Sequence, residues 1–283
     1  MQKANLVAIG LAGLALSSAA NAVVIGGFDS LRTLGDPYSI YGASNARTEL
    51  FDTTKYALYG DTLDFAGPTA VATDTYLAGI DIFFTGLIDF NARKLTSVEV
   101  SSLTAFINGG GVVIAHGDNT SFSETVDGLL NAFGLDVVNS SSNPSSTTVA
   151  ITNPTHPIMN GPFGAVSSHA ISDSARLGPA VGDARIIGTY SDGFGAIGVV
   201  DPLGARLGGL LFLPDSETYG LTFGNFRNQP EARRLFDNSI AWAVGIANTD
   251  HTPPTTQVPE PASLLMFGAG LLALGFARRR ARS

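Results

Sequence analysis

Residues 116–119, with the sequence His-Gly-Asp-Asn, are the part of the chain best suited to bind a ligand or move a proton. They follow the apolar run 112–115, whose composition is typical of a strand buried on both faces. An imidazole, a carboxylate and an amide placed together could orient a sugar hydroxyl, hold a cation or transfer a proton. Alternatively, Asp118 or Asn119 caps the helix that follows while His116 bonds to the backbone, which is how such turns are normally satisfied.

Three further carboxylates follow predicted strands. Asp29 comes after the apolar run 23–27, and Asp215 and Glu217 come after the run 206–213. If these strands are parallel, their carboxyl ends meet at one edge of the sheet, where pockets of such folds form. Asp215 is equally a credible turn residue. The candidate ligand-binding residues are therefore Asp29, His116, Asp118, Asn119, Asp215 and Glu217, and no catalytic residue is assigned.

The sequence predicts no metal site and no cofactor. It contains no cysteine, no D-x-D-x-D-G loop and no pair of histidines at helical spacing. A zinc site would require His116, His156 and His169 to meet in space with a carboxylate. Binding of Ca²⁺ by an acidic rim and a Ser-His-Asp triad both remain open, because their members need not be close in sequence. No particular serine is indicated.

The elements that must position these residues alternate between short apolar runs and helical periodicity. Thr96 and Glu99 form a T-x-x-E capping box that predicts a helix ending at the glycines 109–111. A second helix is expected from about Ser123 to Phe133, and a closing helix over 229–244. Expected strands are 23–27, 80–85, 112–115, 148–151, 184–190, 195–200 and 206–213.

The N-terminal segment 1–22 has the features of a secretory signal peptide. Lys3 supplies the positive start, an apolar stretch follows, and Ala20 and Ala22 form a small-x-small cleavage site. The apolar stretch is too short to span a bilayer. The sequence therefore predicts export through the Sec translocon, with a mature chain that begins near Val23.

The C-terminal segment 258–283 combines three features. Pro259, Glu260 and Pro261 precede an apolar run over 262–277, and Arg278, Arg279 and Arg280 follow it. At about 1.5 Å per residue this run is about 24 Å long, so it spans a bilayer only with help from thinning or snorkelling arginines. The arginines would face the cytoplasm. An ordinary membrane anchor is the alternative, but an anchor does not need Pro-Glu-Pro.

This combination resembles the PEP-CTERM sorting signal of Gram-negative bacteria. The resemblance implies that an exosortase recognises Pro259, Glu260 and Pro261 and cuts nearby. The C-terminal helix would hold the protein in the membrane before processing, and the domain would afterwards reach the cell surface or the exopolysaccharide matrix.

The net charge of the mature chain limits the classes of macromolecule that it can bind. Without its two end segments the chain keeps 11 basic and 23 acidic residues, a formal charge near −12. Phosphate contacts need clustered Lys and Arg, so a nucleic-acid partner is excluded. Exopolysaccharide is a possible partner, although such a surface repels anionic polymers unless divalent cations bridge them. The Pro/Thr-rich residues 246–257 read as a linker between the domain 23–245 and the sorting segment.

Three segments of the domain resemble the class I glutamine amidotransferase-like superfamily, in its ThuA-like branch. They are 103–119, 153–161 (NPTHPIMNG) and the strand-to-helix run 208–244. The resemblance implies a flavodoxin-like three-layer sandwich, with a mostly parallel sheet and extra strands in the second half. The family's amidotransferases need a nucleophilic cysteine, and its absence here excludes glutaminase chemistry.

Two functions follow from these observations. The first is an exported surface or matrix protein whose amidotransferase-like domain binds a ligand without catalysis. The alternative is a secreted carbohydrate-active hydrolase or isomerase that uses His116 and nearby carboxylates. The enzyme would require His116 to lie beside a carboxylate in a closed pocket, whereas a binding module tolerates an open rim.

Overall fold

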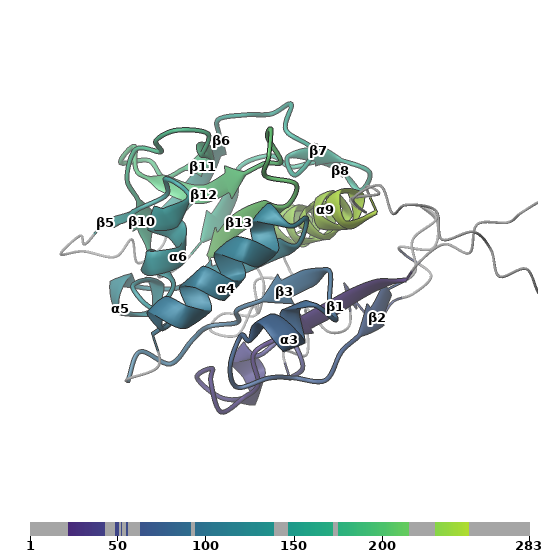
Figure 1. The fold of residues 1–283 in the computed structure, drawn as a ribbon. Coiled ribbons are helices and arrows are strands. Elements are labelled where there is room, and N and C mark those ends of the chain that lie inside the picture. Colours follow the sequence, from purple (N-terminus) through teal and green to yellow (C-terminus); the bar gives the residue numbers. More distant parts are fainter. Residues whose placement is uncertain are drawn as a thin grey trace, which may run out of the picture. The chain divides into compact units, whose positions relative to one another are not determined.

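Five adjacent parallel strands, beginning at one edge, form the parallel part of a larger mixed sheet (Figure 1). The computed structural model describes residues 22–42, 49–50, 52, 55, 63–91, 94–138, 147–171, 175–214 and 230–248. In spatial order the parallel strands are β2 (Leu63–Phe65), β1 (Val23–Gly27), β3 (Ile82–Phe84), β4 (Val112–Gly117) and β13 (Gly209–Pro214). The expected parallel core with extra strands in the second half is thereby confirmed.

Antiparallel strands extend the sheet beyond β13. The order continues through β12 (Gly195–Val200), β11 (Arg185–Thr189), β6 (Thr147–Ile151) and β9 (His169–Ile171). A branch leaves β12 through β10 (Arg176–Leu177) to β5 (Val137–Val138). A separate hairpin is formed by β7 (Asn160–Gly161) and β8 (Gly164–Ala165).

The register of the parallel strands aligns their carboxyl ends. Ile82 pairs with both Ile25 and Val112, and Val112 also pairs with Gly209. Every residue of β3, β4 and β13 is buried, as expected for strands covered on both faces. The sequence predicts that the strand beginning at Val112 ends at Ala115, but the structure continues it to Gly117, because β13 pairs with it as far as Pro214.

Helices cover both faces of this sheet. Val112 and Ile114 pack in one core with α9 (Pro230–Ala247), whereas Val113 and Ala115 pack in a second core with α4 (Ser97–Asn108) and α6 (Asp127–Ala132). The short helix α3 (Asp74–Leu77) lies beside α4, and a 3-10 turn, η1 (Asp36–Tyr38), follows β1 (Figure 1). This alternation along one strand produces the three layers of the domain.

The predicted capping box is present at the start of α4. The Thr96 hydroxyl accepts a hydrogen bond from the Glu99 amide at 3.2 Å, and the Glu99 carboxylate accepts one from the Thr96 amide at 2.9 Å. Glu99 is almost fully buried and also pairs with Arg32 at 2.8 Å. The helix is therefore fixed at its first turn to the loop that follows β1.

The expected single helix after residue 123 is wrong. The structure contains two short helices, α5 (Thr120–Ser123) and α6, because the Thr125 carbonyl accepts a hydrogen bond from the Leu95 amide at 3.0 Å. This carbonyl thus bonds outside the helix. The apolar positions Val126, Leu129 and Leu130 are nevertheless fully buried, as their spacing predicts.

Two element boundaries also differ from expectation. The last strand begins at Gly209 rather than Arg206, because Arg206 pairs with Leu203 across the preceding turn. Helix α9 reaches Ala247 and so includes the first two residues of the predicted linker. None of the helices within the described ranges is long and apolar enough to cross a membrane. The sorting segment 258–283 and, except for Ala22, the signal segment 1–22 lie outside those ranges.

Replacing Thr96 by alanine should lower the free energy of unfolding by about 1–2 kcal/mol, because the two hydrogen bonds of its hydroxyl at the capping box are lost. Urea denaturation measures the change. Ser101→Ala, at an exposed position of the same helix, is the matched control and should stay within about 0.5 kcal/mol of the native protein. Equal effects of the two substitutions would show that the cap is not important for stability.

Candidate functional site

His116 lies inside the core rather than at a pocket rim. Its side chain belongs to the part of β4 covered by α9, the residue is 0% exposed, and its ring stacks on that of Phe84 with centroids 5.9 Å apart. Its amide donates to the Thr85 hydroxyl at 3.0 Å. Burial lowers the pKa of His116 to about 3, so the imidazole is neutral at physiological pH. A group with this pKa is a poor proton carrier near pH 7.

The other described candidates serve largely as turn and capping residues. The Asp29 carboxylate accepts hydrogen bonds from the amides of Leu31 at 3.1 Å and Arg32 at 2.9 Å. The Asn119 side chain accepts one from the Ser121 amide at 3.1 Å, at the start of α5. For Asn119 this is the capping alternative that the sequence left open.

The strand order determines which candidates are neighbours. Asp118 is half-buried and shares the end of β4 with His116 and Asn119, while Asp29 follows β1, two strands away. Asp215 and Glu217 lie outside the described residues, although Pro214, which precedes them, pairs with Gly117. The set of six therefore remains a prediction.

A buried histidine pairs with a half-buried aspartate elsewhere in the domain. His156 Nε2 is 3.2 Å and 3.3 Å from the two carboxylate oxygens of Asp201, and its Nδ1 accepts a hydrogen bond from the Ile158 amide at 3.2 Å. This geometry assigns the proton of the neutral ring to Nε2. Burial, together with the nearby charge of Arg185, lowers the pKa of His156 to about 4.

Asp201 is the centre of this cluster. Its carboxylate also accepts a hydrogen bond from Trp242 Nε1 at 3.0 Å and pairs with Arg185. The Asp201 carbonyl accepts two more from Arg206, at 3.0 Å and 2.7 Å. The donors come from the loop after β6, from β11, from the turn before β13 and from α9. The cluster therefore joins four parts of the fold, and its hydrogen-bonding capacity is largely used internally.

Sequence reasoning missed this cluster. His156 lies in the loop after β6, and Asp201 directly follows β12. Their pairing across 45 residues depends on the sheet order. The only local signal is an aspartate directly after a buried strand.

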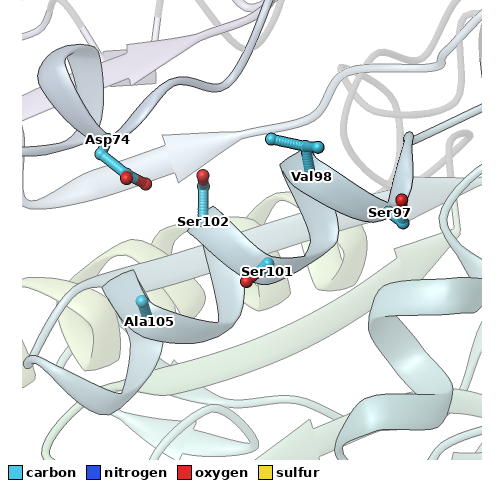
Figure 2. Close-up of a pocket in the computed structure, with 6 residues that line it drawn as sticks. All are labelled: Asp74, Ser97, Val98, Ser101, Ser102 and Ala105. Carbon is cyan, nitrogen blue, oxygen red and sulfur yellow. The ribbon is translucent and has the colours of Figure 1, made fainter.

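A polar pocket of about 330 Å³ lies between α3 and α4. Figure 2 shows Asp74 on α3 with its carboxylate directed toward the side chains of α4. The α4 residues that line it are Ser97, Val98, Ser101, Ser102 and Ala105. One carboxylate and three hydroxyls can bond to a polar ligand.

A second pocket, of about 370 Å³, lies at the start of α9. Its cationic side chains are paired with carboxylates: Lys55 contacts Glu49 and Asp237, and Arg233 contacts Glu49 at 2.8 Å. Burial raises the pKa of Asp237 to about 6, with Lys55 acting in the opposite direction. The positive charge at this pocket is thus largely neutralised.

A third pocket, of about 350 Å³, lies where β10, β11 and β12 meet, and its lining is mainly apolar. None of the three pockets is lined by a histidine. In the described part of the chain, no group of three His, Asp or Glu side chains could hold a metal ion.

Comparison with known proteins identifies the C-terminal segment. The family model for the PEP-CTERM protein-sorting motif matches residues 257–281. The chain therefore carries this sorting motif, as its Pro-Glu-Pro, apolar and arginine segments predict. No curated protein matches the chain at a significant level.

Solved structures show the fold of the domain. The N-terminal domain of mmIFT52 is 13% identical with a TM-score of 0.57, over 78% of this chain and 97% of that one. Cytoplasmic protein STM1381 from Salmonella typhimurium LT2 is 12% identical with a TM-score of 0.52, over 78% of this chain and 98% of that one. A putative ThuA-like protein from Bacteroides uniformis ATCC 8492 is 13% identical with a TM-score of 0.47, over 79% of this chain and 91% of that one.

These comparisons define a flavodoxin-like α/β domain in a chain that ends in a PEP-CTERM motif. At this level of identity, the similarity shows the fold alone.

The His156–Asp201 pair makes stability depend on pH in a specific way. The pKa of His156 is depressed on folding, so its contribution to stability is fully present above pH 6.5 and is lost as the pH falls toward about 4. The His156→Gln variant has no titrating group at this position, so it does not lose this contribution to stability as the pH falls. The stability difference between the native protein and the variant, measured by urea denaturation, should therefore shrink between pH 6.5 and pH 4.

Comparing the two proteins at each pH cancels the opposite contribution of Asp237, whose raised pKa adds stability as the pH falls below about 6. A difference that stays constant over this range would contradict the assignment of a neutral, buried His156.

Proposed function

We propose that this protein is exported, processed by an exosortase at its C-terminal motif, and displayed at the cell surface or in the exopolysaccharide matrix as a non-catalytic binding module. The PEP-CTERM motif over residues 257–281 carries the proposal. Its Pro-Glu-Pro triplet supplies the recognition element, and the apolar run with its arginines would hold the chain in the membrane until cleavage.

The opposite end of the chain supports export. Segment 1–22 has a positive start, an apolar stretch and the small residues Ala20 and Ala22 at the position of cleavage. A chain without cysteine has no thiol that could be oxidised outside the cytoplasm. The acidic mature domain also suits a protein that must stay soluble after release.

The chemistry of the described residues supports binding rather than catalysis. His116 is buried and neutral, and the polar groups of Asp29 and Asn119 are bonded to backbone amides. The imidazole of His156 is bonded at both nitrogens. Among the groups that the enzymatic alternative would require, His116, Asp29 and Asn119 are thus engaged in maintaining the fold.

Changing Pro259, Glu260 and Pro261 together to alanine should retain the protein in the membrane fraction of its bacterial host. The physical reason is that the apolar run 262–277 stays attached when the recognition triplet is lost. Membrane and medium fractions, separated and probed for the protein, measure the distribution.

The matched control replaces Pro253 and Pro254, which precede the motif, by alanine, and it should be released as the native protein is. Unchanged release of the triple variant would defeat the proposal of exosortase processing.

A further inference from the structure

The third pocket, between β10 and the β11–β12 hairpin, lies in the antiparallel extension of the sheet. None of the six candidate residues predicted from the sequence lines it. It forms where the sheet branches: Gly195 pairs with Leu177 of β10 on one side and with Thr189 of β11 on the other. The β11–β12 ladder is irregular here, with register shifts on both sides of Gly188. Irregular pairing of this kind re-aims side chains and is frequent next to binding sites.

Glycines keep this hollow open. A Cβ on Gly195 would lie 2.9 Å from Ile186 and 3.0 Å from Leu177, and one on Gly178 would lie 2.9 Å from Val138. Gly193, in the hairpin turn, has a φ of +89°, which side-chain-bearing residues rarely adopt. The volume of about 350 Å³ is at the lower end of small-molecule sites, which run from about 300 to 1,000 Å³.

One aromatic ring is held at this hollow in a fixed position. Phe194 is 36% exposed although it is large and apolar, and its amide donates to Asp192 at 3.2 Å. Its carbonyl accepts from the Tyr190 amide at 2.9 Å, which closes the turn. The Arg176 guanidinium lies over the ring, 5.6 Å from its centroid. The ring is therefore preorganised.

Polar groups flank the ring. Arg176 Nε donates to the Asp192 carboxylate at 2.7 Å, and a terminal nitrogen of the same guanidinium lies 2.5 Å from that carboxylate. The Asp192 side chain nevertheless keeps 36% of its surface exposed. Thr189 adds a hydroxyl-bearing residue to the lining. The lining thus offers a carboxylate and a hydroxyl next to an aromatic surface, and the buried Arg176 guanidinium holds that carboxylate in place.

This combination matches the surface of a pyranose ring, which has an apolar C–H face and a rim of hydroxyls that both donate and accept hydrogen bonds. The Arg176–Asp192 pair has no net charge, and the Asp136 carboxylate lies 3.9 Å from the position of a Cβ on Gly178. The mature domain as a whole is acidic. An anionic sugar would therefore be repelled here, whereas a neutral one would not.

From this geometry we propose that the pocket binds a hexose unit of a neutral polysaccharide, with Phe194 against the sugar face and Asp192 and Thr189 bonded to its hydroxyls. The inference rests on the proposed function, because it names the ligand class of the binding module. Aromatic rings at such sites supply much of the binding through the apolar area they cover.

Affinity electrophoresis of the full-length chain in mild detergent tests this proposal, with dextran, laminarin or galactomannan in the gel as neutral probes and alginate as an anionic one. At least one neutral polysaccharide should retard the protein, and alginate should not. Phe194→Ala should raise the apparent Kd about tenfold or more, and Asp192→Asn should weaken binding in the same direction.

Leu203→Ala is the matched control, because Leu203 is an equally apolar, 58% exposed residue on the turn before β13 and does not line the pocket. Circular dichroism establishes whether each variant is folded, and Asp192→Asn decides the question if Phe194→Ala does not fold. Retardation by none of the neutral probes, retardation by alginate alone, or equal binding by the Phe194 and Leu203 variants would each overturn the proposal.

This outcome is independent of sorting. A protein that is released normally but binds none of these polysaccharides would refute the sugar site and leave exosortase processing intact. A protein that binds a neutral polysaccharide but is released without its Pro-Glu-Pro triplet would refute the processing alone.

Discussion

The burial of β4 on both faces is the constraint on which the described domain depends. This strand pairs with β3 on one side and with β13 on the other, over all six of its residues in the second case. Because α9 covers one face and α4 with α6 the other, alternate residues of β4 face two separate cores. A polar side chain placed there loses its water on either face, and this explains why the imidazole of His116 is neutral.

The same constraint separates what the sequence could predict from what it could not. The capping box at Thr96 and the apolar runs of β1 and β4 depend on local chemistry, so their types and positions are recoverable from the chain alone. The split between α5 and α6 depends on one hydrogen bond from Leu95, a residue outside the helical pattern. No periodicity reports such a contact.

The candidate site was harder to predict for a related reason. Residues 116–119 do follow a buried strand, but the strand continues two residues further than its apolar run because β13 accompanies it. His116 therefore lies in the core, and not at the rim where the sequence predicts it. The partnership of His156 with Asp201 depends on bringing the loop after β6 next to the end of β12, and only the strand order does so.

The cluster around Asp201 has a consequence for how this sequence can change over time. One carboxylate serves an imidazole, an indole and a guanidinium, which come from the loop after β6, from α9 and from β11. Loss of the carboxylate would leave all three donors short of an acceptor at once, a cost that no single second substitution repairs. Substitutions at positions 156, 185, 201 and 242 should therefore be correlated among relatives, although these positions are spread over 87 residues of the chain.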